Sequence, residues 1–92
     1  MNLDELRMQI NKLDEDMKRS FLERMKIAKA VAEYKLKNGL PILDEERENA
    51  LIEKNSAQID DEMLRKYYIE FLKNNIAISK QYQAQIFEEN ND

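Results

Sequence analysis

The sequence predicts an all-α protein. Two observations indicate this fold class: the position of the helix-breaking residues and the period at which apolar residues recur. The chain contains one Gly and one Pro, and both lie in a single break at Gly39-Leu40-Pro41. No segment alternates apolar and polar residues with the period of two that a half-buried strand requires. Apolar residues recur instead three and four positions apart, which is the period of an amphipathic helix. At 92 residues the chain is long enough for one small domain, so 1–92 is treated as a single helical domain.

Composition excludes several classes of protein. With 42% hydrophobic and 37% charged residues, the chain is too apolar for a disordered segment and too interrupted by charge for a membrane span of ~20 apolar residues. A formal net charge of −4 argues against nucleic-acid binding, which favours a basic surface. The absence of Cys and His removes thiolate nucleophiles, the commonest general base and the commonest metal ligand. Residues 1–6 do not resemble a secretory signal, so a cytoplasmic location is expected.

The first helix is expected at about 2–37. Asn2 and Glu5 have the spacing of a capping box, and Asn38-Gly39 is typical of a helix C-terminus. A helix of this length is roughly 50 Å long, which exceeds the diameter of a compact domain of this size. We therefore predict an intertwined homodimer in which two copies of this helix bury each other's stripe. That stripe steps by three and four residues: Leu3, Leu6, Ile10, Leu13, Met17, Ser20, Arg24, Ile27, Val31 and Tyr34.

Two further helices follow a loop at 38–43. The second is expected at about 44–55, with Asp44 as its N-cap and acidic residues in its positive first turn. The third is expected at about 60–88, with Asp60 as its N-cap. Its stripe has the same spacing as that of the first helix: Leu64, Tyr68, Leu72, Ile76, Ser79, Gln83 and Ile86.

Polar residues stand beside or within the apolar stripes of all three helices. Arg24 and Lys35 are eleven residues apart, about three turns, so they point the same way. Ser79 and Gln83 are neighbours at i,i+4. Burying such groups unpaired costs several kcal/mol, so we expect them, together with Arg47 and Glu48, to meet a polar and anionic ligand. Each residue alone is explained as well by solvation, by an ion pair or by a hydrogen bond that sets helix register; their joint occurrence favours a site.

These residues lie in a pattern that resembles the all-helical chorismate mutases, the AroQ class. The resemblance is close over 3–55 and resumes at 79–83. The segments that carry it are Leu6-Arg7-Met8-Gln9-Ile10-Asn11-Lys12-Leu13-Asp14, Glu23-Arg24, Val31-Ala32-Glu33-Tyr34-Lys35, Gly39-Leu40-Pro41-Ile42-Leu43-Asp44, Arg47-Glu48 and Ser79-Lys80-Gln81-Tyr82-Gln83.

The resemblance implies a three-helix protomer, an intertwined dimer with two active sites, and the rearrangement of chorismate to prephenate in phenylalanine and tyrosine biosynthesis. This Claisen rearrangement is pericyclic, so it needs no nucleophile, proton shuttle, metal or cofactor. By family role, Arg24 and Arg7 would bind the two carboxylates of the substrate. Lys35 and Gln83 would donate hydrogen bonds to the ether oxygen as the C–O bond breaks.

The remaining site residues also take their roles from the resemblance. Glu48 and the backbone at Asp44 would hold the ring hydroxyl, Ser79 would contact a carboxylate, and Arg47 would orient Asp44 and Glu48. Arg7 precedes Arg24 by seventeen residues, roughly 25 Å along the helix, so one small molecule cannot contact both from the same chain. Arg7 must therefore come from the partner subunit.

Two alternatives stay open at this point. Isochorismate-pyruvate lyases share the fold and its cations, but the intact Asp44-x-x-Arg47-Glu48 pattern favours the mutase. A non-catalytic helical dimerisation protein would use the polar residues to set register. The chain departs from the family pattern at Met25, where many relatives have a basic residue, and Lys80 lies beside the predicted ligand face. Because little chain follows the third helix, no dehydratase, dehydrogenase or regulatory domain is expected.

Overall fold

The computed structural model describes residues 1–90 and has three helices, α1 (Leu3–Lys37), α2 (Glu45–Ser56) and α3 (Glu62–Glu89). Residues 91 and 92, which the sequence analysis included in the domain, lie outside the described residues. No strand occurs within residues 1–90, and the all-α prediction is confirmed for them. The helix ends differ from the expected ones by one or two residues at most.

Local hydrogen bonds explain where α1 begins and ends. The backbone N–H of Glu5 donates to Asn2 Oδ1 at 2.9 Å, and the backbone N–H of Asn2 donates to Glu5 Oε2 at 3.4 Å, which completes the capping box. At the other end Gly39 has a φ of +65°, in the left-handed region. The backbone N–H of Leu40 donates back to the carbonyl of Lys35 at 2.8 Å, as in a Schellman motif. The chain therefore reverses within a few residues and leads directly into α2.

The N-cap of α3 differs from the predicted one. Asp61, not Asp60, caps the helix, and its Oδ1 accepts a hydrogen bond from the backbone N–H of Leu64 at 2.9 Å. The Arg65 guanidinium explains the shift, because it donates to the carbonyls of Ile59 at 2.9 Å and Asp60 at 3.2 Å. These two bonds keep Asp60 in the turn and delay the helix by one residue.

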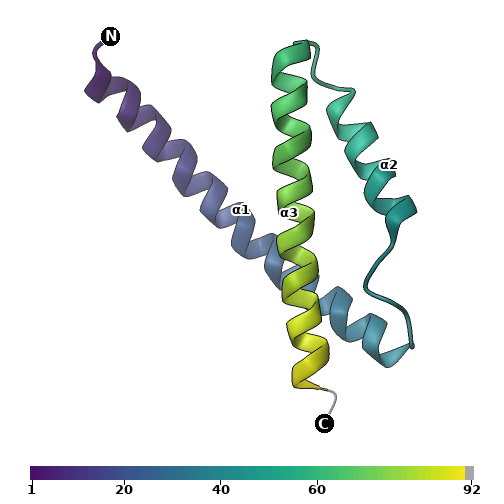
Figure 1. Ribbon diagram of the computed structural model, residues 1–92. Helices are drawn as coiled ribbons and strands as arrows, with labels where there is room; N and C mark the ends of the chain where they lie inside the picture. The colour runs from purple at the N-terminus through teal and green to yellow at the C-terminus, as the bar shows by residue number, and fades with distance from the viewer. Residues whose placement is uncertain (91–92) are drawn as a thin grey trace.

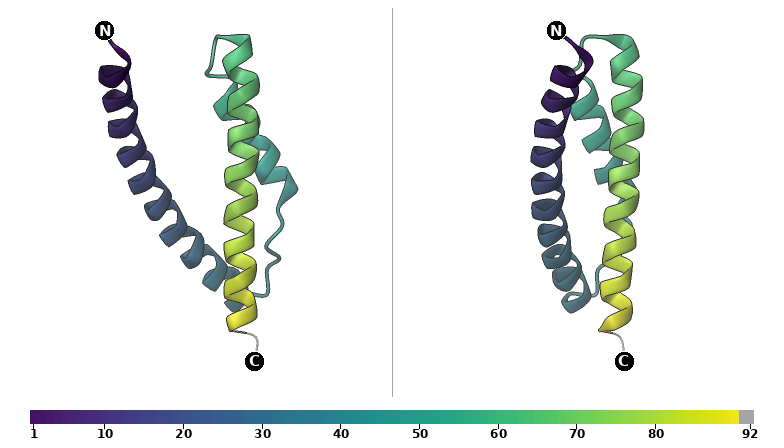
Figure 2. Two further views of the ribbon diagram at one scale, coloured as in Figure 1. Left: turned by 60° about the vertical axis from the view of Figure 1, so that its left-hand side comes forward. Right: turned by 90° about the vertical axis from the view of Figure 1, so that its left-hand side faces the viewer.

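Helix α3 is the central element of the fold (Figure 1). The C-terminal half of α1 crosses it, α2 packs along it, and the N-terminal half of α1 runs away from it (Figures 1 and 2). The molecule measures 56 × 26 × 14 Å, and its radius of gyration is 16.6 Å. A compact domain of this length has a radius of gyration of about 12 Å, so a single chain is unusually open.

The core of one chain is small. Within residues 1–90 its buried apolar side chains are Ala28, Ala32, Leu72 and Ile86. Both alanines lie on α1 but outside its predicted stripe, whereas stripe members such as Ile27 are largely exposed. The face of α1 that packs within the chain is therefore not the predicted seam, because small residues allow the helices to cross closely there. On α3 the predicted stripe is at least half-buried from Tyr68 onward, but Leu64 is exposed.

The N-terminal half of α1 presents an apolar face that nothing within residues 1–90 covers. Leu6, Ile10, Leu13 and Met17 are between 42% and 66% exposed on this face. Large uncovered apolar faces on isolated chains mark interaction surfaces. Across residues 1–90, none of the helices combines the length and the apolar character that crossing a membrane requires.

Candidate active site

Side chains from the three helices and from the loop after α1 line an open cavity of about 630 Å³. It lies at the C-terminal half of α1, opposite the start of α2 and the C-terminal half of α3. Seven of the eight side chains predicted for the site line it: Arg24, Lys35, Asp44, Arg47, Glu48, Ser79 and Gln83. Ala28, Val31, Leu51 and Ile76 add apolar wall. Residues up to 59 positions apart in sequence, from Arg24 to Gln83, are thus brought to one site.

Arg7 is the predicted site residue that does not line the cavity. It is exposed on the N-terminal half of α1, the part that runs away from α3 (Figure 1). A separation of seventeen residues from Arg24 corresponds to about 25 Å of straight helix. Within one chain Arg7 and Arg24 therefore cannot bind the same small molecule.

The loop after α1 holds Lys35 at the cavity. Its Nζ donates a hydrogen bond to the backbone carbonyl of Ile42 at 3.0 Å, and the side chain is half-buried. The tight turn at Gly39 brings Ile42 within reach. An ammonium group has three donors, so two of them stay available for a ligand.

Asp44 and Arg47 form the first turn of α2. Asp44 Oδ1 accepts a hydrogen bond from the backbone N–H of Arg47 at 3.1 Å, which caps the helix. The expected link from the Arg47 guanidinium to Asp44 and Glu48 is not present within residues 1–90; the contact to Asp44 is made by the Arg47 backbone. Both side chains are exposed in the single chain, so the Arg47 guanidinium is available to a ligand or a partner.

Glu48 has one paired and one unpaired carboxylate oxygen. Oε1 accepts from Lys80 Nζ at 2.9 Å, in an ion pair that joins α2 to α3. Oε2 is buried and has no hydrogen-bond partner within residues 1–90. Buried polar atoms in folded proteins are nearly always hydrogen-bonded, so Oε2 is an acceptor placed to receive a ligand donor.

Ser79 and Gln83 form a polar pair on a single turn of α3. Gln83 Nε2 donates to Ser79 Oγ at 3.2 Å, and Gln83 Oε1 is buried without a partner within residues 1–90. A half-turn of the amide exchanges the two atoms: the Ser79 hydroxyl then donates to Oε1 and Nε2 points into the free space. The pair can therefore present either an acceptor or a donor to a ligand.

The cavity carries more positive than negative charge, although the whole chain is acidic. Its lining includes four basic side chains, Arg24, Lys35, Arg47 and Lys80, and three acidic ones, Glu23, Asp44 and Glu48, a net charge of +1. This surplus beside an apolar wall suits a small anion with an apolar body. Within residues 1–90, no three His, Cys, Asp or Glu side chains are grouped to hold a metal ion.

Ser20, Glu23 and Lys80 also line the cavity, although they were not predicted as site residues. A signal for Lys80 was available, because Ile76, Lys80 and Gln83 step by four and three residues and so share a face of α3. A comparable signal marks Glu23, because Ser20, Glu23 and Ile27 step by three and four residues and so share a face of α1. Glu23 lies in the cavity wall because α1 crosses α3 at this point.

Comparison with known proteins assigns the family of this chain. The profile of the chorismate mutase type II family matches residues 6–84. The chain belongs to the type II chorismate mutase family. This match includes every residue predicted for the site, from Arg7 to Gln83. As a chorismate mutase, the chain is an enzyme that isomerises chorismate.

Two curated relatives agree with this family. The chain is 32% identical over 85 residues to a chorismate mutase of Methanocaldococcus jannaschii, an alignment that spans 87% of this chain and 86% of that protein. It is 46% identical over 52 residues to a bifunctional chorismate mutase/prephenate dehydratase of Aquifex aeolicus, which spans 56% of this chain and 14% of that much longer protein. No solved structure gives a significant match to the chain.

Proposed function

We propose that this chorismate mutase converts chorismate to prephenate at the cavity between its three helices, in phenylalanine and tyrosine biosynthesis. The observation that carries the proposal is the convergence of seven polar side chains on a cavity with a net charge of +1. Family membership supports the same reaction. The substrate is a dianion with an apolar ring, which matches a cationic pocket with an apolar wall.

The reaction requires the protein to position the substrate and to stabilise the charge that develops on it. A Claisen rearrangement breaks the ether C–O bond and forms a C–C bond within one molecule, so no proton or electron has to move to the protein. Negative charge builds on the ether oxygen, and Lys35 Nζ and Gln83 Nε2 donate hydrogen bonds to it. Preorganised donors of this kind in a dry site are worth ~10²–10³ in rate each.

Substrate binding selects the compact conformer in which the reacting carbons meet. Arg24 and Ser79 bind one carboxylate, and Arg7 of the partner subunit binds the other. Glu48 Oε2, which is buried and unpaired in the free site, accepts the hydrogen bond of the ring hydroxyl beside the backbone of Asp44. The Arg47 guanidinium, which is exposed in the single chain, adds a positive charge to the part of the cavity that Asp44 and Glu48 line.

The active unit in this proposal is an intertwined homodimer. Its support is the uncovered apolar face formed by Leu6, Ile10, Leu13 and Met17, together with the radius of gyration of 16.6 Å. Burying such a face against a second copy stabilises it by ~25 cal/mol for each Å² of apolar area removed from water. The same packing carries Arg7 of each copy to the other copy's cavity. The cytoplasmic location stays a prediction of the sequence, and cell fractionation would check it.

The direct test is turnover of chorismate. We expect the purified protein, produced in a host without its own mutase, to remove the ultraviolet absorbance of chorismate and to form one prephenate per substrate. Protein with both Lys35→Ala and Gln83→Ala is the control for contaminating and uncatalysed reaction. A folded protein that leaves chorismate unchanged would contradict the proposal. If it instead cleaves isochorismate to pyruvate, the lyase of the same fold is the correct assignment.

A further inference from the structure

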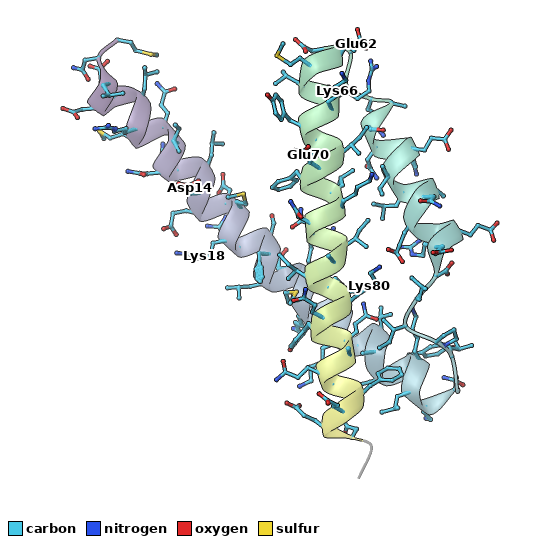
Figure 3. All side chains as sticks on the ribbon, viewed as in Figure 1. Asp14, Lys18, Glu62, Lys66, Glu70 and Lys80 are labelled. Atoms are coloured by element: carbon cyan, nitrogen blue, oxygen red, sulfur yellow. The ribbon has the colours of Figure 1, made fainter. Side chains whose placement is uncertain are left out.

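The ion pair between Lys80 and Glu48 forms part of the cavity lining. Lys80 Nζ on α3 lies 2.9 Å from Glu48 Oε1 on α2, and the side chains are 36% and 22% exposed. Figure 3 shows the Lys80 side chain leaving α3 on the side of α2. Among residues 1–90 the other ion pairs, such as Lys18–Glu15, lie within α1 at i,i+3 and are well exposed. The Lys80–Glu48 pair is therefore the one that joins two helices and lines the cavity.

This pair determines which oxygen of Glu48 is left for a ligand. Lys80 occupies Oε1, while Oε2 is buried and unpaired within the described residues. A glutamate side chain has three rotatable bonds, so without a partner on Oε1 its carboxylate would sample several orientations. With Lys80 in place, one acceptor is held in the position where the proposed function needs it.

Lys80 also changes the charge of the pocket. Without it, the three acidic and three remaining basic side chains of the lining would cancel. With it, the lining carries +1, and Arg7 of the partner subunit would bring this to +2, equal and opposite to a dianion. Glu48 can thus serve as an acceptor without repelling the two carboxylates of the substrate.

We propose that Lys80 is a positioning residue for substrate binding: it holds the Glu48 carboxylate so that Oε2 accepts the ring hydroxyl, and it neutralises the repulsion between Glu48 and the dianion. This role rests on the proposed function. It assigns Lys80 a task in binding, in contrast to Lys35 and Gln83, which act on the breaking bond.

The two tasks have different kinetic signatures. The ring hydroxyl takes no part in the bonds that break and form, so its hydrogen bond is the same in the bound substrate and in the transition state. Loss of such an interaction raises KM and leaves kcat unchanged. A charge-assisted hydrogen bond in a partly exposed site is worth about tenfold in binding, so Lys80→Met should raise KM about tenfold and change kcat by less than about twofold.

The experiment compares steady-state kinetics of Lys80→Met and Lys80→Gln with those of Lys80→Arg and Lys18→Met. Lys80→Arg keeps the cation and should keep KM near the unmodified value. Lys18→Met breaks an exposed lysine–glutamate pair outside the cavity and should change neither constant. A purely structural role for Lys80 would lower the active fraction, and hence kcat, without raising KM. An unchanged KM in either neutral variant would overturn the proposal.

A double-mutant cycle with Glu48→Gln tests whether Lys80 acts through Glu48. If it does, Lys80→Met adds little to the rise in KM already caused by Glu48→Gln. Full additivity would overturn the proposal, because Lys80 would then act on the substrate by itself. The unmodified protein separates the two levels of inference. If it does not turn over chorismate, the proposed function fails and this role fails with it; if it does and the Lys80 variants behave normally, only this role fails.

Discussion

The amide nitrogen of Gln83 donates to the hydroxyl oxygen of Ser79 at 3.2 Å, and the amide oxygen of Gln83 is buried without a partner within residues 1–90. Both residues lie on the same face of α3, one turn apart, and both line the cavity. A neutral side chain with both a donor and an acceptor is thus held in the same cavity as Lys35, in a lining of net positive charge. The chemistry proposed for Gln83 depends on its donor.

Replacing that amide by a carboxyl group should make the activity depend on acid. In Gln83→Glu the side chain donates a hydrogen bond only when protonated, and a glutamate has an ordinary pKa of about 4.3. We expect low activity at neutral pH that rises as the pH falls towards about 5. The measurement is kcat against pH beside the unmodified protein. A pH profile identical to that of the unmodified protein would remove Gln83 from the proposed mechanism.

Lys35→Ala should abolish most of the turnover without unfolding the chain. Its Nζ is held by the carbonyl of Ile42 at 3.0 Å and is the proposed donor to the breaking bond. We expect kcat to fall by ~10²–10³, with an unchanged helical circular dichroism spectrum. Lys37→Ala, two residues later on the exposed end of α1, is the matched control and should keep full activity. Normal turnover in Lys35→Ala would contradict the site assignment.

The proposed sharing of each site between two copies predicts complementation. Arg7→Ala and Lys35→Ala should each be inactive alone, because every site then lacks one residue. After mixing and subunit exchange, a heterodimer has one complete site, so random pairing should restore about a quarter of the unmodified activity. Absence of recovery, with exchange verified by mass spectrometry, would show that Arg7 does not act across the dimer.

The uncovered face of α1 predicts which residues support the dimer. A charge at Ile10, which is 56% exposed in the single chain, would be buried against the partner at a cost of several kcal/mol. Ile10→Asp should therefore dissociate the dimer to the 11.0 kDa chain, measured by sedimentation equilibrium. Asn11→Asp adds the same charge one position away from the stripe and should leave the assembly intact. A dimeric Ile10→Asp would place the interface elsewhere.

Substitution of Gly39 should lower the free energy of unfolding through the backbone conformation, without involving the side chains of the cavity. Its φ is +65°, and a Cβ at this position would meet nothing within 4 Å. The cost of Gly39→Ala is therefore conformational, about 1 kcal/mol of the free energy of unfolding. Gly39→Asn should cost less, because Asn adopts the left-handed region more readily. Urea unfolding of the three proteins would check this order, and an unaffected Gly39→Ala would show that the turn can relax.

The face of each helix could be predicted from sequence only in part. The stripe on α3 is buried or half-buried from Tyr68 onward, whereas Leu64 near the start of the helix is exposed. On α1 the periodic residues and the buried ones differ, since Ala28 and Ala32 pack within the chain while the stripe from Leu3 to Tyr34 is left uncovered. The residues of α1 that pack within the chain are thus small alanines, whereas the periodicity marks the larger apolar residues on another face.

The number, length and order of the helices could be predicted from the sequence, because the ends of a helix depend on side chains a few residues away. Asn2 with Glu5, Asp44 with the N–H of Arg47, and the turn at Gly39 are all contacts of this local kind. Helical spacing also predicted which polar residues share a face of a helix. Together with the family pattern, it predicted seven of the polar side chains that line the cavity. The cap of α3 was predicted one residue early, because Asp60 and Asp61 are adjacent and both suit an N-cap; Asp61 is the one that accepts from the N–H of Leu64.

Which faces of the three helices pack against one another depends on the tertiary structure. Glu48 pairs with Lys80, thirty-two residues away, because α2 and α3 pack with those two positions opposite each other at 2.9 Å. Glu23 enters the cavity wall for a similar reason, at the crossing of α1 and α3. Such contacts depend on the angle and the register at which helices cross, and these are set by the summed packing of many side chains. The spacing of residues within one helix therefore does not predict the angle or the register at which two helices cross.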